Sequence, residues 1–362
     1  MRYIIEKDQR PVYLHLYRQL RDDILRGVFP YGSRLPSKRL LAEETGVSAV
    51  TVEHAYDILC DEGYAESRER SGYFVLFRQG DGFAAAAPLA HPRPGRSAPP
   101  EAGFPLSVLS KTMRRVLTEY HGEIMEKSPN SGHPRLQEAL RRYLARNRGI
   151  HVSSEQIIIG SGAEYLYRLV VDLLGRDRIY AIENPSYEKI RQIYQAAGVK
   201  YRLLPLVRDG IDNQALFKTD ADVLHTTPYQ SFPSGVTASA SRRHEYIRWA
   251  GAKKRLIIES DYGSEFSVAA GPMETLFVLS DRDNVIYTNT FSKTISSSMR
   301  MGYLVLPRWL VQPFQEKLGF YSCSVPTFEQ FVLTELIESG DFERHINRIR
   351  RSKRKALTAS RE

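Results

Sequence analysis

The sequence predicts two domains, a small α+β domain over residues 1–78 and a larger α/β domain over residues 105–345. Three observations lead to this prediction. Capped helical segments and a short hairpin fill the first part of the chain, an Ala-, Pro- and Gly-rich linker covers residues 79–104, and strand-like and helical segments alternate after it. A chain of 362 residues is also longer than one hydrophobic core usually organises.

The composition limits the class of protein. A hydrophobic content of 42% fits a globular chain, and there is no run of 18 uncharged apolar residues that would cross a membrane. The first residues, MRYIIEKDQR, have no apolar segment of signal-peptide length, so we expect a cytoplasmic location and no membrane partner. Cys60 and Cys323 are the only cysteines, which predicts neither a disulfide framework nor a metal site.

The net charge of +9 is unevenly distributed. Residues 1–78 contain 12 Lys or Arg and 12 Asp or Glu, whereas residues 344–362 contain eight Lys or Arg and one acid, a net +7. Most of the excess therefore belongs to the C-terminal tail. The total charge is a weak argument for nucleic-acid binding, which has to rest on the pattern in the first domain.

That pattern begins with three helical segments. Residues 11–27 place Leu14, Tyr17, Leu20, Ile24 and Leu25 close to helical spacing. Ser37 is a plausible N-cap for KRLLAEET, which Gly46 ends, and Ser48 can cap AVTVEHAYDILCDEG. Two helices joined through a tight glycine turn form a helix-turn-helix, whose second helix can enter the major groove.

A basic hairpin follows the helices. YAESRERSGYFV reads as two short strands around Arg70, Ser71 and Gly72, which is typical of a wing. The alternative is a small helical domain with an incidental hairpin, but the spacing, the caps and the wing agree with one another. On "GSRLPS", "GVS", "EGY" and "SG", the segment from residue 10 to 78 resembles the winged-helix domain of the GntR family of bacterial transcription regulators.

The resemblance implies a partner, a double-stranded DNA operator. The residues that it places near DNA are Arg34, Ser37, Lys38, Arg39, Ser48, Thr51, His54, Arg70, Ser71 and Gly72. One position departs from the family pattern, because Ala49 stands after "GVS" where an arginine is usual. The loss of that side chain removes one phosphate or base contact.

The larger domain alternates strands with helices, which predicts a mostly parallel sheet with chemistry in the loops at the strand ends. Strand-then-loop segments are QIIIGSG, RIYAIENPSY, VLHTTPYQSFPSG, RLIIESDYGSEF and NVIYTNTFSKT. Lys293 follows the last of these strands. A lysine there can form a Schiff base with pyridoxal phosphate, and Arg300 can bind the phosphate. A lone lysine at a strand end is usually a solvated surface residue, so the neighbouring residues carry the argument.

Those neighbours support a phosphate site. GSGAEYLY opens a helix at a glycine turn and offers backbone N–H groups to an anion. Tyr262 can donate to the phenolic oxygen of the cofactor, and Tyr187 can stack on its ring. Residues 105 to about 345 resemble the fold type I, aminotransferase-like domain of the MocR subfamily of GntR regulators, on "SGHPRLQEALRRYLARNRGI", "ENPSY", "TPYQSFPSGVTAS" and "TFSKTISSSMRMGYLVLP".

The MocR resemblance implies roles for individual residues. It gives Lys293 the covalent bond to pyridoxal 5'-phosphate and Arg300 a phosphate contact, and it gives Tyr262 and Tyr187 the roles above. Ser292, Gly162, Ala163 and Glu164 complete the phosphate cup. The fold expected is thus a winged helix-turn-helix followed by a fold type I aminotransferase-like domain, and we expect a homodimer.

Ser260 departs from that pattern. The subfamily usually reads Glu-Asp-Asp-Tyr where this chain has Glu259-Ser260-Asp261-Tyr262, and the first aspartate pairs with the pyridine nitrogen. Alternation along a strand puts Ser260 and Tyr262 on one face and Asp261 on the other. A serine cannot keep the pyridine nitrogen protonated, so the ring would withdraw electrons weakly.

The end of the chain is the second departure. MocR proteins continue into a small C-terminal domain, and here the sequence stops at RKALTASRE, so residues 346–362 are expected to be a basic helix with no partner or the truncated start of that domain.

Three functions therefore remain open: a PLP-binding regulator that senses an amine or amino acid without turnover, an aminotransferase with a DNA-binding module, and a regulator that no longer holds cofactor. Lys293 argues against the third, and Ser260 argues against the second.

Overall fold

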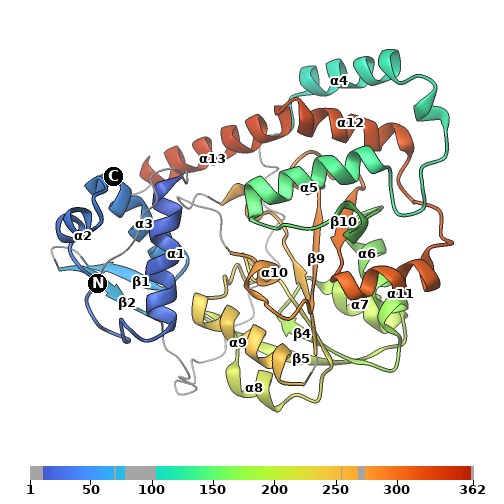
Figure 1. Ribbon diagram of the computed structural model, residues 1–362. Helices are drawn as coiled ribbons and strands as arrows, with labels where there is room; N and C mark the ends of the chain where they lie inside the picture. Colours follow the sequence, from blue (N-terminus) through green and yellow to red (C-terminus); the bar gives the residue numbers. More distant parts are fainter. Residues whose placement is uncertain (1–10, 69–70, 78–102, 254, 268–273, 360–362) are drawn as a thin grey trace. The chain divides into compact units, whose positions relative to one another are not determined.

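The computed structural model describes residues 11–68, 71–77, 103–253, 255–267 and 274–359. The chain forms two compact units, one that contains the first 86 residues and one that contains most of the remainder (Figure 1). Of the linker predicted over residues 79–104, only Gly103 and Phe104 are described. Arg70, a predicted wing residue, also lies outside the described residues.

In the N-terminal unit, the described residues 11–68 and 71–77 form three helices and a two-stranded hairpin. They are α1 (Val12–Leu25), α2 (Lys38–Thr45), α3 (Ala49–Asp61), β1 (Ala65–Arg68) and β2 (Gly72–Val75), and the two strands pair antiparallel. Leu16, Leu41 and Leu59 are fully buried and join the three helices in one core. The order and the bounds agree with the predicted winged helix-turn-helix.

The predicted helix caps are present in this unit. Ser37 Oγ accepts a hydrogen bond from the N–H of Leu40 at 3.2 Å, and Ser48 Oγ accepts one from the N–H of Thr51 at 3.1 Å. Each cap of this kind stabilises a helix by about 1 kcal/mol. Gly46 ends α2 with φ 69°, a left-handed conformation that glycine adopts without steric cost, and so sets the tight turn into α3.

The larger unit is built on an eight-stranded sheet with the order β3-β10-β9-β8-β7-β4-β5-β6. The strands are β3 (Ile157–Gly160), β4 (Ile179–Asn184), β5 (Lys200–Val207), β6 (Gly210–Ile211), β7 (Val223–Thr226), β8 (Leu256–Ser260), β9 (Val285–Thr290) and β10 (Gly302–Val305). The neighbours β5, β4, β7, β8 and β9 run parallel, while β10 is antiparallel to both β9 and β3. The prediction of a mostly parallel sheet is confirmed, and β10 together with β6, which is antiparallel to β5, makes the sheet mixed.

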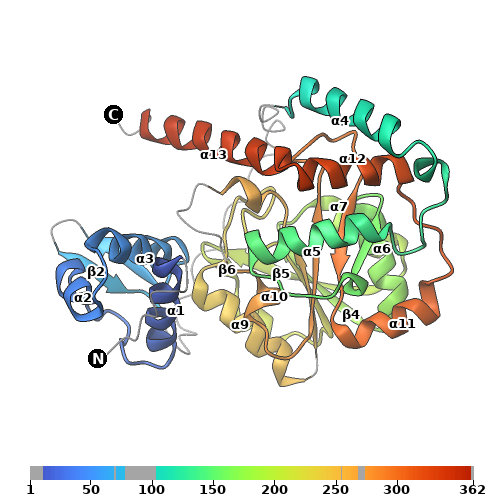
Figure 2. The same ribbon diagram turned by 45° about the horizontal axis from the view of Figure 1, so that its top comes forward.

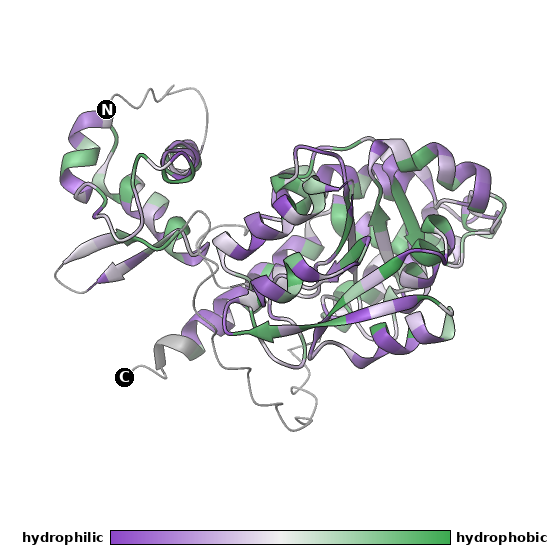
Figure 3. Ribbon diagram, turned by 90° about the horizontal axis from the view of Figure 1, so that it is seen from below, coloured by the Kyte–Doolittle hydropathy of each residue, from purple (hydrophilic) through white to green (hydrophobic). Residues whose placement is uncertain are grey.

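Helices cover both faces of this sheet (Figure 2). One apolar cluster contains residues of α4 (Leu106–Glu119), α5 (Pro134–Arg148), α12 (Thr327–Glu338) and α13 (Asp341–Ala359), and the other contains residues of α6 (Ala163–Leu174), α7 (Glu188–Ala196) and α11 (Arg308–Leu318). The shorter helices are α8 (Asn213–Lys218) and α10 (Leu276–Leu279), and α9 (Ala240–Ala252) lies between β7 and β8 in the chain. Several strands are hydrophobic along their length while the helices carry both kinds of residue, as expected for a covered sheet (Figure 3).

The basic C-terminal segment is part of the second unit. Helix α13 begins at Asp341, and its residues Phe342, Ile346 and Ile349 are buried in the core with α12. Arg350 Nε donates a hydrogen bond to the carbonyl oxygen of Glu265 at 2.6 Å. The expectation of a helix without a partner is therefore wrong for its first turns, because an apolar stripe is interleaved with the basic residues. In the part of the chain that the structure describes, no helix has the length and hydropathy to cross a membrane.

Candidate functional site

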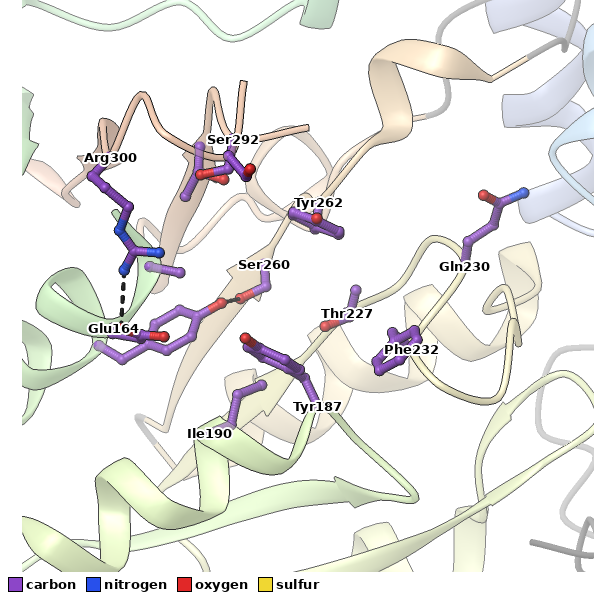
Figure 4. Close-up of a pocket in the computed structure, with 14 residues that line it drawn as sticks. Glu164, Tyr187, Ile190, Thr227, Gln230, Phe232, Ser260, Tyr262, Ser292 and Arg300 are labelled. Carbon is purple, nitrogen blue, oxygen red and sulfur yellow. Dashed lines mark hydrogen bonds and ion pairs between the residues drawn. The ribbon is translucent and has the colours of Figure 1, made fainter. Parts of the chain in front are cut away.

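A cavity of about 330 Å³ opens at the carboxyl ends of the parallel strands, where ligands bind in open α/β sheets. Ser260 and Thr290 are the last residues of β8 and β9, and Thr227 follows β7 directly. Helix α6 closes one side with its N-terminus (Figure 4). The residues that line the cavity are Ala163, Glu164, Tyr167, Tyr187, Ile190, Thr227, Gln230, Phe232, Ser260, Tyr262, Thr290, Ser292, Ser297 and Arg300.

The N-terminus of α6 faces a cation. Gly162 precedes the helix with φ 91°, and no side chain caps the first N–H groups. The guanidinium of Arg300 lies close enough that a Cβ at residue 162 would be 3.7 Å from Nη2. Free N–H groups, the helix dipole and an arginine are together an anion-binding arrangement. Ser292 lines the cavity near Arg300 (Figure 4).

Glu164 occupies part of this anion-binding end. Arg300 Nη2 donates to Glu164 Oε2 at 2.9 Å (Figure 4). Lys189 forms a short ion pair with the same carboxylate. The hydrogen bond from Lys189 and the neighbouring positive charges lower the pKa of Glu164. Arg300, Lys189 and Glu164 together have a net positive charge, so this end of the cavity can still bind an anion.

Lys293 lies beside the cavity, against Tyr262. Its Nζ is 5.1 Å from the centroid of the Tyr262 ring and its side chain is partly buried. A Cβ at residue 263 would lie 2.6 Å from Nζ, so the glycine, with φ +82°, makes room for the lysine. The Lys293 side chain is outside the set that lines the cavity, whereas Tyr262 is within it.

The floor of the cavity is a row of buried hydrogen bonds. Ser260 Oγ lies 2.8 Å from Tyr167 Oη and 2.8 Å from His225 Nε2, and His225 Nδ1 lies 2.7 Å from Tyr194 Oη. Burial lowers the pKa of His225 to about 3, so the imidazole is neutral. No sequence pattern indicated this row, because its members come from α6, α7, β7 and β8.

Asp261 is directed away from the cavity. It forms a buried ion pair with Arg148 at the end of α5, and Tyr287 Oη donates to Asp261 Oδ2 at 2.5 Å. The side chains of both members of the pair are less than a tenth exposed. Asp261 therefore cannot replace an aspartate at position 260, as the alternation of the strand predicts.

The mouth of the cavity is aromatic and mostly uncharged. Tyr187 and Phe232 meet edge to face with ring centroids 6.2 Å apart, and Gln230 lies beside them with φ 45° (Figure 4). Glu183 at the end of β4 fixes this loop from beneath, because it accepts hydrogen bonds from the N–H of Thr227 at 3.0 Å and from Ser231 Oγ at 2.7 Å. Sequence reasoning missed Gln230 and Phe232, which belong to the loop after β7.

The N-terminal unit presents polar and basic residues around α3. Arg34, Arg39, Ser48 and His54 are exposed. Ser71 lies in the turn of the hairpin, and Gly72 begins β2. Lys38 instead pairs with Glu53 of α3 at 2.6 Å. The side chains of Ser37 and Ser48 are engaged in helix caps. Val50, 59% exposed at the start of α3, was not predicted.

Comparisons with known proteins support the folds expected for both units. Residues 12–75 match the family described as bacterial regulatory proteins, gntR family, and residues 101–360 match aminotransferase class I and II. The chain is 31% identical to the uncharacterized HTH-type transcriptional regulator YdeL of Bacillus subtilis, over 95% of this chain and 77% of that protein. It is also 31% identical to the probable rhizopine catabolism regulatory protein MocR of Rhizobium meliloti, over 94% and 74% of the two chains.

The chain belongs to the MocR-like subfamily of GntR transcription regulators. Among solved structures, an archaeal alanine:glyoxylate aminotransferase matches with a TM-score of 0.62 and 25% identity, over 67% of this chain and 62% of that one. The chain thus spans less than two thirds of that enzyme's length and about three quarters of the length of the two regulators. The aminotransferase-like fold of the second unit agrees with the prediction.

In this MocR-like protein, most of the residues that were predicted to contact the cofactor line the same cavity. Tyr187, Ser260, Tyr262, Ser292 and Arg300 line one cavity, together with Ala163 and Glu164. Gly162 sets the approach of α6, and Lys293 lies behind Tyr262. In the described part of the chain no cluster of His, Cys, Asp and Glu has the form of a metal site.

Proposed function

We propose that this protein is a transcription regulator that binds operator DNA through its N-terminal unit and holds pyridoxal 5'-phosphate in the cavity of the larger unit. The cavity then serves to sense an amine or amino acid rather than to turn one over. The observation that carries the proposal is the coexistence of an anion-binding end, a lysine and a hydrogen-bonding floor around one cavity of about 330 Å³. The proposed domains are residues 1–78 for DNA and residues 105–345 for the cofactor.

The residues present fit this cofactor. The uncapped N-terminus of α6 and Arg300 would bind the phosphate, with Ser292 beside them. At the other end, Ser260 would face the ring nitrogen, and Tyr262 would hydrogen-bond the phenolic oxygen. Tyr187, 37% exposed at the mouth, would cover the ring.

Pyridoxal phosphate supplies, when bound, an aldehyde that combines covalently with amines and a ring that withdraws electrons. The chain's own contribution is binding and orientation. Lys293 would hold the aldehyde carbon, and an incoming amine would compete with it for that carbon. The aromatic, uncharged mouth favours an amine whose remaining part is neutral or apolar. Asp261, which follows Ser260 in the chain, is committed to its ion pair with Arg148 and would not reach the ring.

We also infer a homodimer that binds two half-sites. Large apolar side chains of the second unit are exposed, among them Leu106 at 77%, Met125 at 85% and Phe320 at 70%. Exposed apolar groups of this size favour contact with another protein surface. A second copy of the chain would also place two winged helices on one operator.

The test of the cofactor assignment uses Lys293→Ala. Addition of pyridoxal phosphate to the wild-type protein should give a visible absorption band, and borohydride should fix the cofactor on the peptide that contains Lys293. The matched control is Lys111→Ala, an exposed lysine of α4, which should behave as wild type. The assignment is wrong if Lys293→Ala gives the same reducible adduct.

A further inference from the structure

Four neutral groups form a single row of hydrogen bonds that ends at the cavity. The row runs from Tyr194 through His225 to Ser260 and then to Tyr167, and its three contacts measure 2.7, 2.8 and 2.8 Å. Ser260 (Figure 4) and Tyr167 line the cavity, whereas Tyr194 is fully buried. The row is therefore closed at the Tyr194 end and open to a ligand at the other.

Each group in the row carries one hydrogen that it can donate. Burial raises the pKa of Tyr167 to about 12 and that of Tyr194 well above its ordinary value, so both phenols are protonated. His225 is neutral and has one N–H, and Ser260 has its hydroxyl. Four hydrogens are thus available for three hydrogen bonds, and one hydrogen is left over.

The direction of the row follows from its closed end. Among the described residues, His225 is the one hydrogen-bond partner of the Tyr194 hydroxyl. If His225 Nδ1 donated to Tyr194, the phenol hydrogen would be buried without an acceptor, which is costly. Tyr194 therefore donates to Nδ1, and His225 carries its hydrogen on Nε2 and donates to Ser260. The spare hydrogen is then on Ser260 or Tyr167, at the cavity.

Among the residues that the structure describes, no carboxylate contacts this donor on the cavity floor. Asp261 is held on the opposite face by Arg148, and Glu259, its neighbour on that face, accepts from the N–H groups of Leu276 and Phe277 at 2.9 Å each. Glu164 lies at the anion-binding end, paired with Arg300 and Lys189. The side-chain partners of Ser260 Oγ are Tyr167 and His225, both neutral.

We propose that the floor of the cavity is a hydrogen-bond donor that selects an aromatic ring nitrogen without a proton. His225 and Tyr194 are positioning residues that fix the direction of the row. The inference rests on the proposed function, because the nitrogen in question is that of pyridoxal phosphate. A protonated ring nitrogen would point its N–H at the unused hydrogen of Ser260 or Tyr167, so two hydrogen-bond donors would face each other without an acceptor.

The first arm of the test uses the ligand-free protein, so it does not depend on cofactor binding. Nitrogen-15 NMR of histidine-labelled protein reports which ring nitrogen of His225 carries hydrogen, and His225→Gln identifies the signal among the nine histidines. If that variant does not fold, Tyr194→Phe identifies the signal by its shift. We expect the hydrogen on Nε2; a hydrogen on Nδ1 overturns the proposal.

The second arm uses pyridoxal phosphate labelled with nitrogen-15 in the ring. In wild type the ring signal should stay at the unprotonated position from pH 6 to pH 8. Ser260→Asp should move it upfield to the protonated position, while Ser260→Asn, of equal size without the charge, should not. A protonated signal in wild type refutes the inference whether or not the variants fold. If no cofactor binds, the proposed function fails, and the first arm still decides the direction of the row.

Discussion

Glu183 shows how one buried carboxyl group can set the pH response of the cavity mouth. It lies at the end of β4 and holds the loop after β7 through Thr226, Thr227 and Ser231. Burial raises the pKa of Glu183 from 4.5 to about 7, although three hydrogen bonds favour the ionised form. The loss of solvation thus outweighs the hydrogen bonds.

The sign of the resulting pH dependence follows from linkage. Between about pH 4.5 and pH 7 the folded protein holds a proton on Glu183 that the unfolded chain has released, so stability falls as pH rises through this window. Glu183→Gln keeps an acceptor for the Thr227 N–H and has no proton to lose. We expect the variant to lose less stability than wild type between pH 5 and pH 7.5 in urea unfolding.

The control for this measurement is Glu188→Gln in the exposed first turn of α7. Glu188 pairs with Arg191 at the surface, so its removal should leave the pH dependence unchanged. An identical pH dependence in Glu183→Gln and wild type would show that the carboxyl group is ionised throughout the range.

At the scale of elements, the residues predicted to contact DNA lie at the start of α2 and at the start of α3. Arg39 is exposed in the first turn of α2, and α3 begins at Ala49 with the exposed Val50 beside it. Because Ala49 stands where an arginine is usual in the family, fewer basic side chains remain to contact DNA. Each remaining one should contribute a larger share of the binding free energy. Val50 is suited to an apolar contact such as a thymine methyl group.

Arg39→Ala should weaken operator binding by about 1 to 3 kcal/mol if the guanidinium reads a base, and by less with a smaller salt dependence if it binds phosphate. The measurement is fluorescence anisotropy with a duplex that wild-type protein selects from a random pool. Arg26→Ala, an exposed arginine after α1, is the matched control. Equal affinity of Arg39→Ala and wild type for that duplex would remove Arg39 from the interface.

Local patterns in the sequence predicted the elements better than the contacts between them. Ser37, Ser48 and Gly46 act within a few residues, so the caps and the turn of the helix-turn-helix were readable. In the row of hydrogen bonds on the cavity floor, the sequence separations of the bonded pairs are 31, 35 and 93 residues. Arg148 and Asp261 are 113 residues apart in the sequence. Such pairs depend on sheet order and register, which the antiparallel strand β10 makes harder to infer from strands and helices alone.

At the scale of the whole molecule, the two units have different chemistry. The N-terminal unit has the winged helix-turn-helix fold of the GntR family, and the larger unit has a cavity lined by Arg300, Tyr187 and Tyr262 with Lys293 beside it. In the proposed sensing role, the second unit changes state when an amine arrives, and exchange of the amine with Lys293 would be enough for that. This role does not need the amine to be consumed.

We therefore expect no sustained transamination. Removal of a proton from the α-carbon of an amino acid requires a ring that withdraws electrons strongly, and an aspartate beside the ring nitrogen normally maintains this through its charge. Here Ser260, His225 and Tyr167 provide neutral hydrogen bonds, and Asp261 is committed to Arg148. Exchange of one amine for another at the aldehyde carbon does not place the same demand on the ring.

The experiment mixes pyridoxal phosphate-loaded protein with a panel of amino acids and a keto acid, and follows keto acid and amino acid products over time. Wild type should change its absorption spectrum with the amines that it binds, and product should stay below one equivalent per chain. Ser260→Asp should form product faster than wild type, and Ser260→Asn should not, because only the first restores a charge beside the ring. Many turnovers by wild type would contradict the sensing role and favour an aminotransferase that carries a DNA-binding unit.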